Sequence, residues 1–370
     1  MNSKLQCSAN SAMSDRSLKL KRIVVIGPFP PPVHGFAQAT KDVAELLEEA
    51  GYKSCRIDLR PVAGEVGIFR AMGLRVRQIF SVWREAKESH GVYVAFSGGI
   101  RQSLDLLLIS IARLRGSRLF LHHHSFAYLD KPTFLSRLCL RVAGRKAIHF
   151  SLCSRMKRLL LDNYPRVCVV EILSNAMLKS VNSSYRMRKT VGTVGYLSAL
   201  TFEKGITTFL EVAKEISNDS KSPAFLIAGP CRDSNIMDAV KAATALCPNV
   251  QYVGPVYGDA KQKFLDSMDV LLFPTTYSNE AEPLVILEAA AAGVPVIAWD
   301  RGCIAETFPI GVEGTSVTVP REVSFIQTAG EQLKQWMTFP ELMERASERT
   351  RIRFEEMANG AIEKLTRAFE

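Results

Sequence analysis

The sequence predicts an α/β protein with two Rossmann-like domains that face a central cleft. Two series of short apolar strands alternate with helices, which is typical of doubly wound parallel sheets. A polar, aperiodic segment at residues 180–190 separates the two series. With 370 residues, the chain is too long for one ordinary hydrophobic core and suits two domains.

The first series begins with the strand Arg22–Gly27, a loop from Pro28 to Gly35 and a helix that starts near Phe36. The other strands expected in it are Cys55–Leu59, Val92–Ser97, Arg118–His122, Ala147–Leu152 and Val167–Leu173. The proline-rich first loop lacks the G-x-G-x-x-G fingerprint of a dinucleotide fold. This absence argues against an oxidoreductase that binds NAD or FAD.

The second series has five expected strands: Thr193–Leu197, Ala224–Gly229, Val250–Val253, Asp269–Phe273 and Val294–Ala298. We therefore expect four segments along the chain. They are a polar, disordered leader at 1–20, a first domain at 21–180, a second domain at 190–345 and a charged helix at 346–370.

The stretch Ser278–Ala298 reads as loop, helix, turn and strand, with the helix at Leu284–Ala292 and Pro283 at its first position. Glu280 lies on the loop and Glu288 lies inside this otherwise apolar helix. A buried carboxylate needs a partner, because an unpaired buried charge is costly. Two kinds of partner are possible. One is the protein itself, through the backbone or an arginine, and the other is the hydroxyls of a ligand bound over the helix N-terminus.

The charge is distributed unevenly along the chain. Residues 1–190 hold 31 Lys and Arg against 13 Asp and Glu, a net charge of +18, and the rest carries −8. The cations alternate with apolar residues, as in the expected helix Gly67–Glu88, which suits an anionic membrane surface better than nucleic acid. An ordinary surface helix with snorkelling arginines is the alternative. We expect a cytoplasmic protein that contacts the inner face of the cytoplasmic membrane and binds no nucleic acid, since no signal peptide or membrane span is evident.

The eight cysteines are scattered without a C-x-x-C pair. They are expected to be reduced, mostly buried thiols, and they predict neither a zinc site nor a disulfide framework.

Candidate binding groups follow the strands of both series, where ligands collect in open α/β sheets. They are Gly35, the histidines 122–124, Lys204 beside Gly205, Val256, and the Glu280 and Glu288 pair. Along a strand His122 and His124 point one way and His123 the other, so hydrogen bonding to a ligand is expected rather than metal binding. Lys204 on a strand-to-helix loop suits a phosphate.

The segment E-A-E-P-L-V-I-L-E, followed by A-A-A-A-G-V-P-V-I-A, resembles the E-x7-E motif of retaining glycosyltransferases of family four. The first-strand loop ending in Gly35, the H-x-H, an N-A at the domain junction, K-G and V-G-P-V occur in the same order as in that family. The resemblance implies the GT-B fold, with a C-terminal helix that crosses back onto the first domain. It also implies a nucleotide-diphospho-sugar donor, a glycan or lipid-linked acceptor, and metal-independent hexosyl transfer with retention and without a cofactor.

Carried over by position, the resemblance implies four catalytic residues: His124, His122, Glu280 and Lys204. Glu280 would contact the donor sugar, Lys204 the diphosphate, and His124 or His122 the sugar that is transferred. The implied donor-binding residues are Gly35, Val256, Pro283, Leu284, Val285 and Glu288, with Glu288 on the ribose.

One departure from the family is that Gly195 is followed by Y-L-S-A-L, where an arginine is usual. A second cation for the diphosphate would then have to come from elsewhere, with Arg232 as a candidate. A surface polysaccharide or glycolipid glycosyltransferase is therefore expected, and the alternative is a non-catalytic GT-B protein that binds a nucleotide sugar or a partner.

Overall fold

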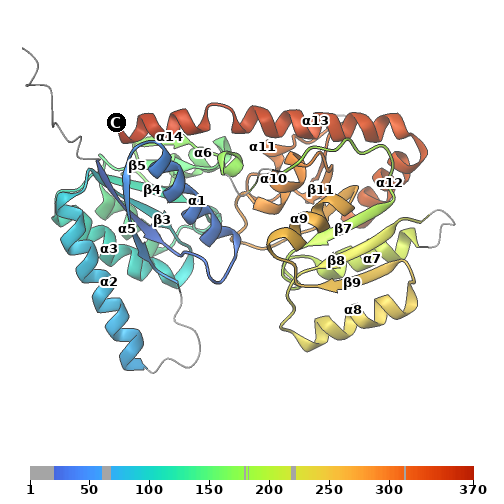
Figure 1. The fold of residues 1–370 in the computed structure, drawn as a ribbon, viewed down its shortest axis with the longest axis horizontal. Helices are drawn as coiled ribbons and strands as arrows, with labels where there is room; N and C mark the ends of the chain where they lie inside the picture. The colour runs from blue at the N-terminus through green and yellow to red at the C-terminus, as the bar shows by residue number, and fades with distance from the viewer. Residues whose placement is uncertain (1–20, 61–67, 179–180, 182, 218–221, 312–313) are drawn as a thin grey trace, which may run out of the picture.

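The computed structural model describes residues 21–60, 68–178, 181, 183–217, 222–311 and 314–370 (Figure 1). The expected leader at 1–20 lies outside the described residues. The chain forms two parallel six-stranded sheets, each covered by helices, in the orders β2-β1-β3-β4-β5-β6 and β12-β11-β10-β7-β8-β9. The expected α/β class with two Rossmann-like units is confirmed.

The first sheet contains β1 (Arg22–Gly27), β2 (Lys53–Asp58), β3 (Gly91–Phe96), β4 (Leu119–His123), β5 (Ile148–Ser151) and β6 (Val169–Ile172). Its helices are α1 (Gly35–Glu49), α2 (Ile68–Glu88), α3 (Gln102–Leu114), α4 (Ala127–Asp130), α5 (Phe134–Ala143) and α6 (Ser154–Asn163). Short 3-10 turns lie at η1 (Gly99–Arg101) and η2 (Asn175–Met177).

The second sheet contains β7 (Thr193–Leu197), β8 (Ala224–Ala228), β9 (Val250–Gly254), β10 (Val270–Phe273), β11 (Val296–Trp299) and β12 (Val317–Val319). Its helices are α7 (Ile206–Ile216), α8 (Ser234–Leu246), α9 (Gly258–Ser267), α10 (Leu284–Ala291), α11 (Ile304–Thr307) and α12 (Phe325–Thr338). Every residue of β3, β4 and β10 is buried, as expected for central strands with helices on both faces. Most expected strands therefore lie within about two residues of the observed ones; the edge strand β12 was not expected.

The C-terminal helices α13 (Pro340–Ala358) and α14 (Ala361–Phe369) run along one side of both halves (Figure 1). Gly360, with a φ of 73°, separates them. Phe369 stacks on Phe120 of the first sheet at a centroid distance of 4.0 Å, and its carbonyl oxygen lies 2.6 Å from His90 Nε2. The end of the chain thus packs on the first half, as the expected C-terminal helix requires.

The polar segment between the two sheets contains a buried arginine. Arg188 is buried, and its guanidinium donates to the carbonyl oxygens of Met268 at 3.1 Å and Ala292 at 2.9 Å. Charged donors of this kind satisfy buried carbonyl groups at a helix C-terminus. The described part of this segment therefore helps to position α10.

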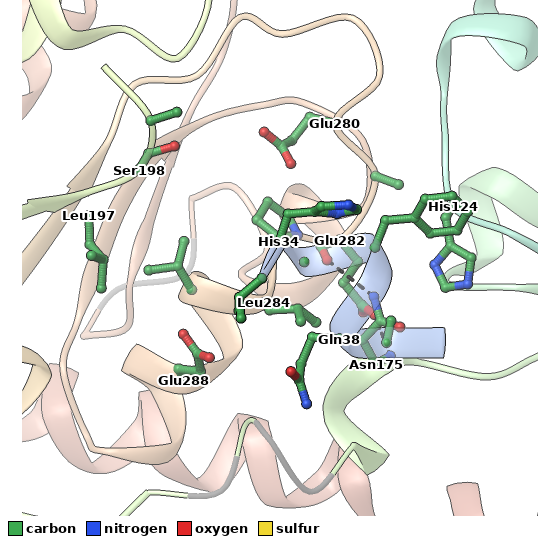
Figure 2. Close-up of a pocket in the computed structure, with 18 of the residues that line it drawn as sticks. His34, Gln38, His124, Asn175, Leu197, Ser198, Glu280, Glu282, Leu284 and Glu288 are labelled. Atoms are coloured by element: carbon green, nitrogen blue, oxygen red, sulfur yellow. Dashed lines mark hydrogen bonds between the residues drawn. The ribbon is translucent and has the colours of Figure 1, made fainter. Parts of the chain in front are cut away.

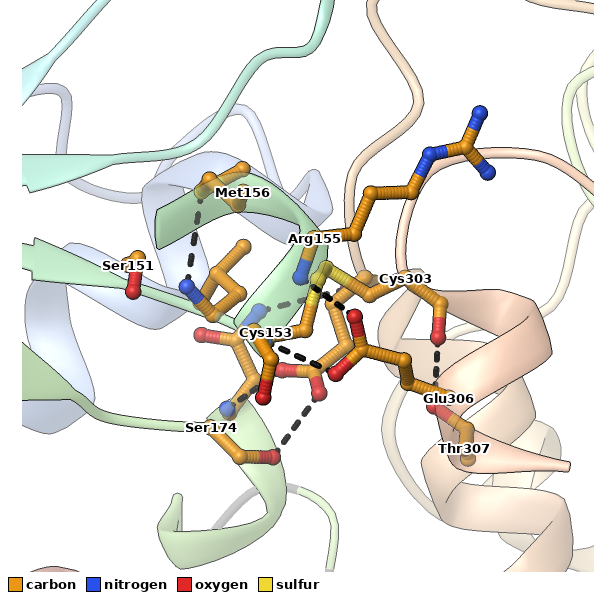
Figure 3. The surroundings of a disulfide bond; sticks show 12 residues. Ser151, Cys153, Arg155, Met156, Ser174, Cys303, Glu306 and Thr307 are labelled. Carbon is orange, nitrogen blue, oxygen red and sulfur yellow. Dashed lines mark hydrogen bonds between the residues drawn. A yellow bond between two sulfur atoms is a disulfide. The ribbon is translucent and has the colours of Figure 1, made fainter. Parts of the chain in front are cut away.

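The expectation that all cysteines are reduced thiols is wrong for one pair. Cys153, just before α6, and Cys303, just before α11, form a disulfide that joins the two halves (Figure 3). Of the free cysteines in the described part of the chain, only Cys139 is buried, so the expectation of mostly buried thiols is also wrong. A span of 150 residues separates the bonded pair, so only the tertiary fold could reveal it.

Among the described residues, no helix is both long and apolar enough to cross a bilayer.

Candidate functional site

A cavity of about 880 Å³ lies between the two sheets, with walls from both halves of the chain. The first half contributes the start of α1 and the loops after β3 and β4, and the second half the loops after β7, β9 and β10. Parallel strands deliver these loops to their carboxyl ends, where ligands bind in open α/β sheets.

Nine of the ten predicted site residues line this cavity: Gly35, His124, Lys204, Val256, Glu280, Pro283, Leu284, Val285 and Glu288. The tenth, His122, does not. It is fully buried behind His124, at a ring centroid distance of 4.2 Å, and its Nδ1 lies 2.8 Å from the Tyr93 hydroxyl oxygen. His122 therefore supports the His124 ring and has no access to the cavity.

Lys204 and Glu280 form one end of the site. The Lys204 ammonium donates to Glu280 Oε2, which also accepts from the Thr275 hydroxyl at 3.2 Å. The same ammonium lies 4.6 Å from the centroid of the Tyr277 ring. A residue with a side chain cannot replace Gly205, because its φ is 81° and a Cβ there would lie 2.1 Å from the Pro274 carbonyl oxygen. The K-G pair thus places a cation close against the loop after β10.

In Figure 2, Glu288 lies on the other side of Leu284 from Glu280. Its side chain is 5% exposed, and Lys261 on α9 donates to its Oε1 at 2.5 Å. Its Oε2 is buried and has no hydrogen-bond partner among the described residues. Burial raises the pKa of this carboxyl and the Lys261 ammonium lowers it. The protein partner is therefore a lysine, and one oxygen is left for a ligand.

Helix α10 carries Glu288, and the loop that precedes it carries Glu280. Its buried residues Ile286, Leu287 and Ala289 anchor it in the core. At its C-terminus Arg351 donates to the carbonyl oxygen of Ala291, so α10 is held at the end away from the cavity. Pro283 is the N-cap in an extended conformation, not the first helical residue as predicted. Leu284 and Val285, the first two residues of α10, line the cavity, so the start of this helix lies at its wall.

The first half brings His34, Gly35 and His124 to the same cavity. His34 is the N-cap of α1, and its Nδ1 accepts from the Ala37 N–H at 3.2 Å. An added Cβ on Gly35 would lie 3.8 Å from Leu284, so the first loop approaches the start of α10 closely. Burial lowers the pKa of His124 to about 3, and its Nε2 has no protein partner among the described residues. His124 is thus a neutral hydrogen-bonding group.

Glu282 lies between the two motif glutamates in sequence but has a different role. Its carboxylate accepts from the Ser174 hydroxyl at 2.8 Å. It also accepts from the Asn175 N–H at 2.6 Å (Figure 2), so the α10 loop is tied to the end of the first half. Burial raises the pKa of Glu282 to about 7, although both hydrogen bonds oppose this shift. The sequence analysis did not single out Glu282.

Sequence reasoning also missed His34, Arg101, Asn279 and Lys261, which line the cavity. The S-G-G-I-R after β3 is a strand-end loop and could have indicated Arg101. No signal marked Lys261, because a lysine on a helix is usually a surface residue. Arg232, the candidate second cation, is exposed and does not line the cavity.

Residues 188–335 match the family model described as glycosyl transferases group 1. This part of the chain is therefore similar to a glycosyl transferases group 1 domain. It holds Lys204, Val256, Glu280 and Glu288, and the buried carboxylates of the site.

A curated relative, 2-deoxystreptamine N-acetyl-D-glucosaminyltransferase of Niallia circulans, is 29% identical over 181 residues, 46% of this chain and 44% of that protein. The chain thus matches less than half the length of this relative. The crystal structure of Anabaena HepE with UDP and glucose has a TM-score of 0.69 at 13% identity and covers 94% of this chain and 98% of its own. WaaG, a glycosyltransferase involved in lipopolysaccharide biosynthesis, has a TM-score of 0.63 at 13% identity, with 95% and 99% covered. The whole chain therefore shares the GT-B fold of these structures.

Proposed function

We propose that the protein is a retaining glycosyltransferase that transfers a hexose from a UDP-sugar to a glycan or lipid-linked acceptor. The observation that carries this proposal is the arrangement of Lys204, Glu280 and Glu288 around the N-terminus of α10 in one cavity. Such an end of a helix binds phosphate through backbone N–H groups and the helix dipole.

In this arrangement the diphosphate lies over the start of α10 and beside the Lys204 ammonium. Glu288 accepts a ribose hydroxyl on its free oxygen, and Glu280 accepts hydroxyls of the donor sugar. Val256 borders the base after β9, and Gly35 places the start of α1 beside Leu284, on the side of the phosphates. Both carboxylates are already held by lysines, which limits the reorganisation that binding requires.

In the reaction the bond between the anomeric carbon and the β-phosphate oxygen breaks, and a bond to the acceptor oxygen forms on the same face. Lys204 and the α10 N–H groups stabilise the charge that develops on the departing phosphate. That phosphate then takes the proton of the acceptor hydroxyl. His124 is neutral at physiological pH, so it contributes a hydrogen bond to the sugar and not an ionised acid.

Two observations favour UDP as the nucleotide and a hexosyl group as the part that is transferred. Related folds were crystallised with UDP, with UDP-glucose, or with UDP and GlcNAc. Two curated relatives are named as an N-acetyl-D-glucosaminyltransferase and a glucosyltransferase of 2-deoxystreptamine.

We further propose that the protein works at the inner face of the cytoplasmic membrane in surface polysaccharide or glycolipid synthesis. On α2 Val76 is 60% exposed and Phe80 62%, and Trp83 lies beside the Arg115 guanidinium. Exposed apolar side chains next to arginines suit the interface of an anionic bilayer.

The donor site is tested with Lys204→Ala and Glu280→Ala, measured as hydrolysis of UDP-glucose or UDP-GlcNAc and transfer to cell-extract acceptors. We expect each change to lower turnover by about 10²–10³-fold, the cost of removing one group that stabilises the transition state. Lys241→Ala and Glu331→Ala are matched controls on exposed helices outside the cavity and should retain full activity.

Wild-type turnover in both cavity variants would contradict the assignment. UDP binding without any hydrolysis or transfer would instead favour the non-catalytic alternative.

A further inference from the structure

The disulfide lies next to the loop that carries Glu280. Cys303 belongs to the segment 300–306, which follows β11, and its N–H donates to the carbonyl oxygen of Ala281 at 2.8 Å. Gly302 has a φ of 60°, and a Cβ there would lie 2.3 Å from the same oxygen and 2.7 Å from the Glu280 carbonyl oxygen. The backbone of the segment 300–306 is therefore in direct contact with the loop between β10 and α10.

Arg301 extends this contact along the loop. Its Nε donates to the Tyr277 carbonyl oxygen at 3.1 Å, and a second guanidinium nitrogen donates to the Ser278 carbonyl oxygen. The third nitrogen pairs with Asp130 at the end of α4, in the first half, at 2.7 Å. Residues 277–281 of the loop are thus held by three consecutive residues, 301–303.

On the other side of the bond, Cys153 belongs to the first half of the chain. It follows Leu152, which lines the cavity just after β5, and it is the N-cap of α6. Both half-cystines are buried. The bond therefore joins the support of the Glu280 loop to the end of a strand in the other sheet, at the edge of the same cavity (Figure 3).

The noncovalent links between the segment 300–306 and the first half are more exposed than the disulfide. Arg155 pairs with Asp300 at 3.0 Å, with 39% and 26% of the two side chains exposed. Glu306 accepts from the Ser154 N–H at 2.8 Å, also at the surface. Solvent-exposed ion pairs add little to stability, so the disulfide is the strongest of these links.

We propose that the Cys153–Cys303 disulfide positions the Glu280 loop for the reaction and that its reduction by a dithiol lowers turnover. This inference rests on the proposed function, in which Glu280 contacts the donor sugar. With the bond closed, the loop is fixed against the first half and Glu280 keeps its place beside Lys204. With the bond open, only the exposed contacts remain, so Glu280 is less well oriented towards the donor.

The reduction is a thiol–disulfide exchange. A thiolate of the dithiol attacks one sulfur of the pair, the S–S bond breaks, and a mixed disulfide forms. The second thiol of the reagent then displaces the protein sulfur. The dithiol becomes a disulfide, and its two electrons and two protons leave Cys153 and Cys303 as thiols. Disulfides in the cytosol are usually transient and redox-sensing, which agrees with such a role at the inner face of the membrane.

The test measures hydrolysis and transfer from UDP-glucose or UDP-GlcNAc by the wild type, oxidised with glutathione disulfide or reduced with dithiothreitol. The temperature is one at which circular dichroism shows both forms to be folded. We expect reduction to lower kcat about tenfold, because small displacements of a catalytic group have large effects on rate, and reoxidation to restore it. UDP affinity, measured by calorimetry, should stay unchanged, since Glu288 lies on the other side of Leu284 from Glu280.

The double variant Cys153→Ser/Cys303→Ser should have the kcat of the reduced wild type and should not respond to dithiothreitol. Cys168→Ser, which changes an exposed free thiol, is the matched control and should respond as the wild type does. A disulfide that only stabilises the fold would change the melting temperature and leave kcat the same in both redox states.

Equal kcat of the oxidised and the reduced wild type would overturn the inference while leaving the proposed function intact. So would a bond that dithiothreitol leaves closed in the folded protein, as measured by alkylation and mass spectrometry. These two measurements decide the question even if the double variant does not fold. Wild-type protein that binds UDP but neither hydrolyses nor transfers from either donor would overturn the proposed function, and the inference with it.

Discussion

Glu280, Glu282 and Glu288 stand close together in the sequence, yet the structure gives each a different partner. Lys204 holds Glu280, Ser174 and Asn175 hold Glu282, and a lysine on α9 holds Glu288. The spacing of the first and last of these glutamates was readable from the sequence. Their partners come from segments far away in the chain, so the sequence could not predict which of these carboxyls have a shifted pKa.

The raised pKa of Glu282, about 7, predicts how the stability of the fold depends on pH. A carboxyl whose pKa is higher in the folded than in the unfolded state favours folding while it is protonated. Its contribution is therefore lost as the pH rises from the unfolded pKa of about 4.3 towards 7.

We expect Glu282→Gln, which keeps the shape but does not ionise, to gain in melting temperature relative to the wild type between pH 4.5 and 7.5. The corresponding gain in the free energy of unfolding is at most roughly 4 kcal/mol. Thermal unfolding across this pH range is the measurement, with Glu331→Gln on the exposed face of α12 as the control. A difference that is constant with pH would show that Glu282 does not titrate in this range.

Among the elements, α10 and α2 depart in opposite directions from an ordinary surface helix. Most of α10 is buried, and its start and its one glutamate line the cavity in which we propose that the donor binds. On α2 several large apolar side chains remain exposed, namely Met72, Leu74, Val76, Phe80 and Trp83. A helix of a soluble enzyme normally buries such residues, which is why a lipid surface is the proposed partner.

This proposal predicts that Val76→Ser/Phe80→Ser weakens binding to vesicles of phosphatidylglycerol and phosphatidylcholine by about tenfold, because two inserted apolar side chains are lost. Sedimentation with vesicles measures the binding, and salt should weaken it in the wild type. Leu246→Ser, which removes an 81% exposed side chain from α8 in the second half, is the control. Equal binding of the wild type to neutral and anionic vesicles would exclude an electrostatic contribution.

In the whole molecule, hydrogen bonds and packing between the two halves of the chain fix the two walls of the cleft relative to each other. Ser125 donates to Asn279 at 2.8 Å across the cavity, and the Ser154 N–H donates to Glu306 at 2.8 Å beside the disulfide (Figure 3). Together with the packing of Phe369 on the first sheet, these contacts link segments that are far apart in the chain.

The disulfide predicts that Cys153→Ser has a lower melting temperature than the wild type when no reductant is present. Dithiothreitol should lower the melting temperature of the wild type and leave that of Cys153→Ser unchanged. The chain-entropy model gives an upper limit of about 5 kcal/mol for so long a loop. Cys168→Ser, which changes an exposed free thiol, is the control and should respond to the reductant as the wild type does.

Alkylation of the native protein followed by mass spectrometry gives an independent measurement. Labelling of Cys153 and Cys303 without prior reduction would contradict the disulfide.

The sequence by itself determined the two βα series, the expected strands, and nine residues that line the cavity, because buried parallel strands are short apolar runs and their ends carry the ligand groups. It could not determine that His122 lies behind His124, that Lys261 pairs with Glu288, or that Cys153 bonds to Cys303. These facts depend on which side chains from distant segments meet and on how deeply each is buried. Only the tertiary structure decides that, because local periodicity reports the face of an element and not its partner.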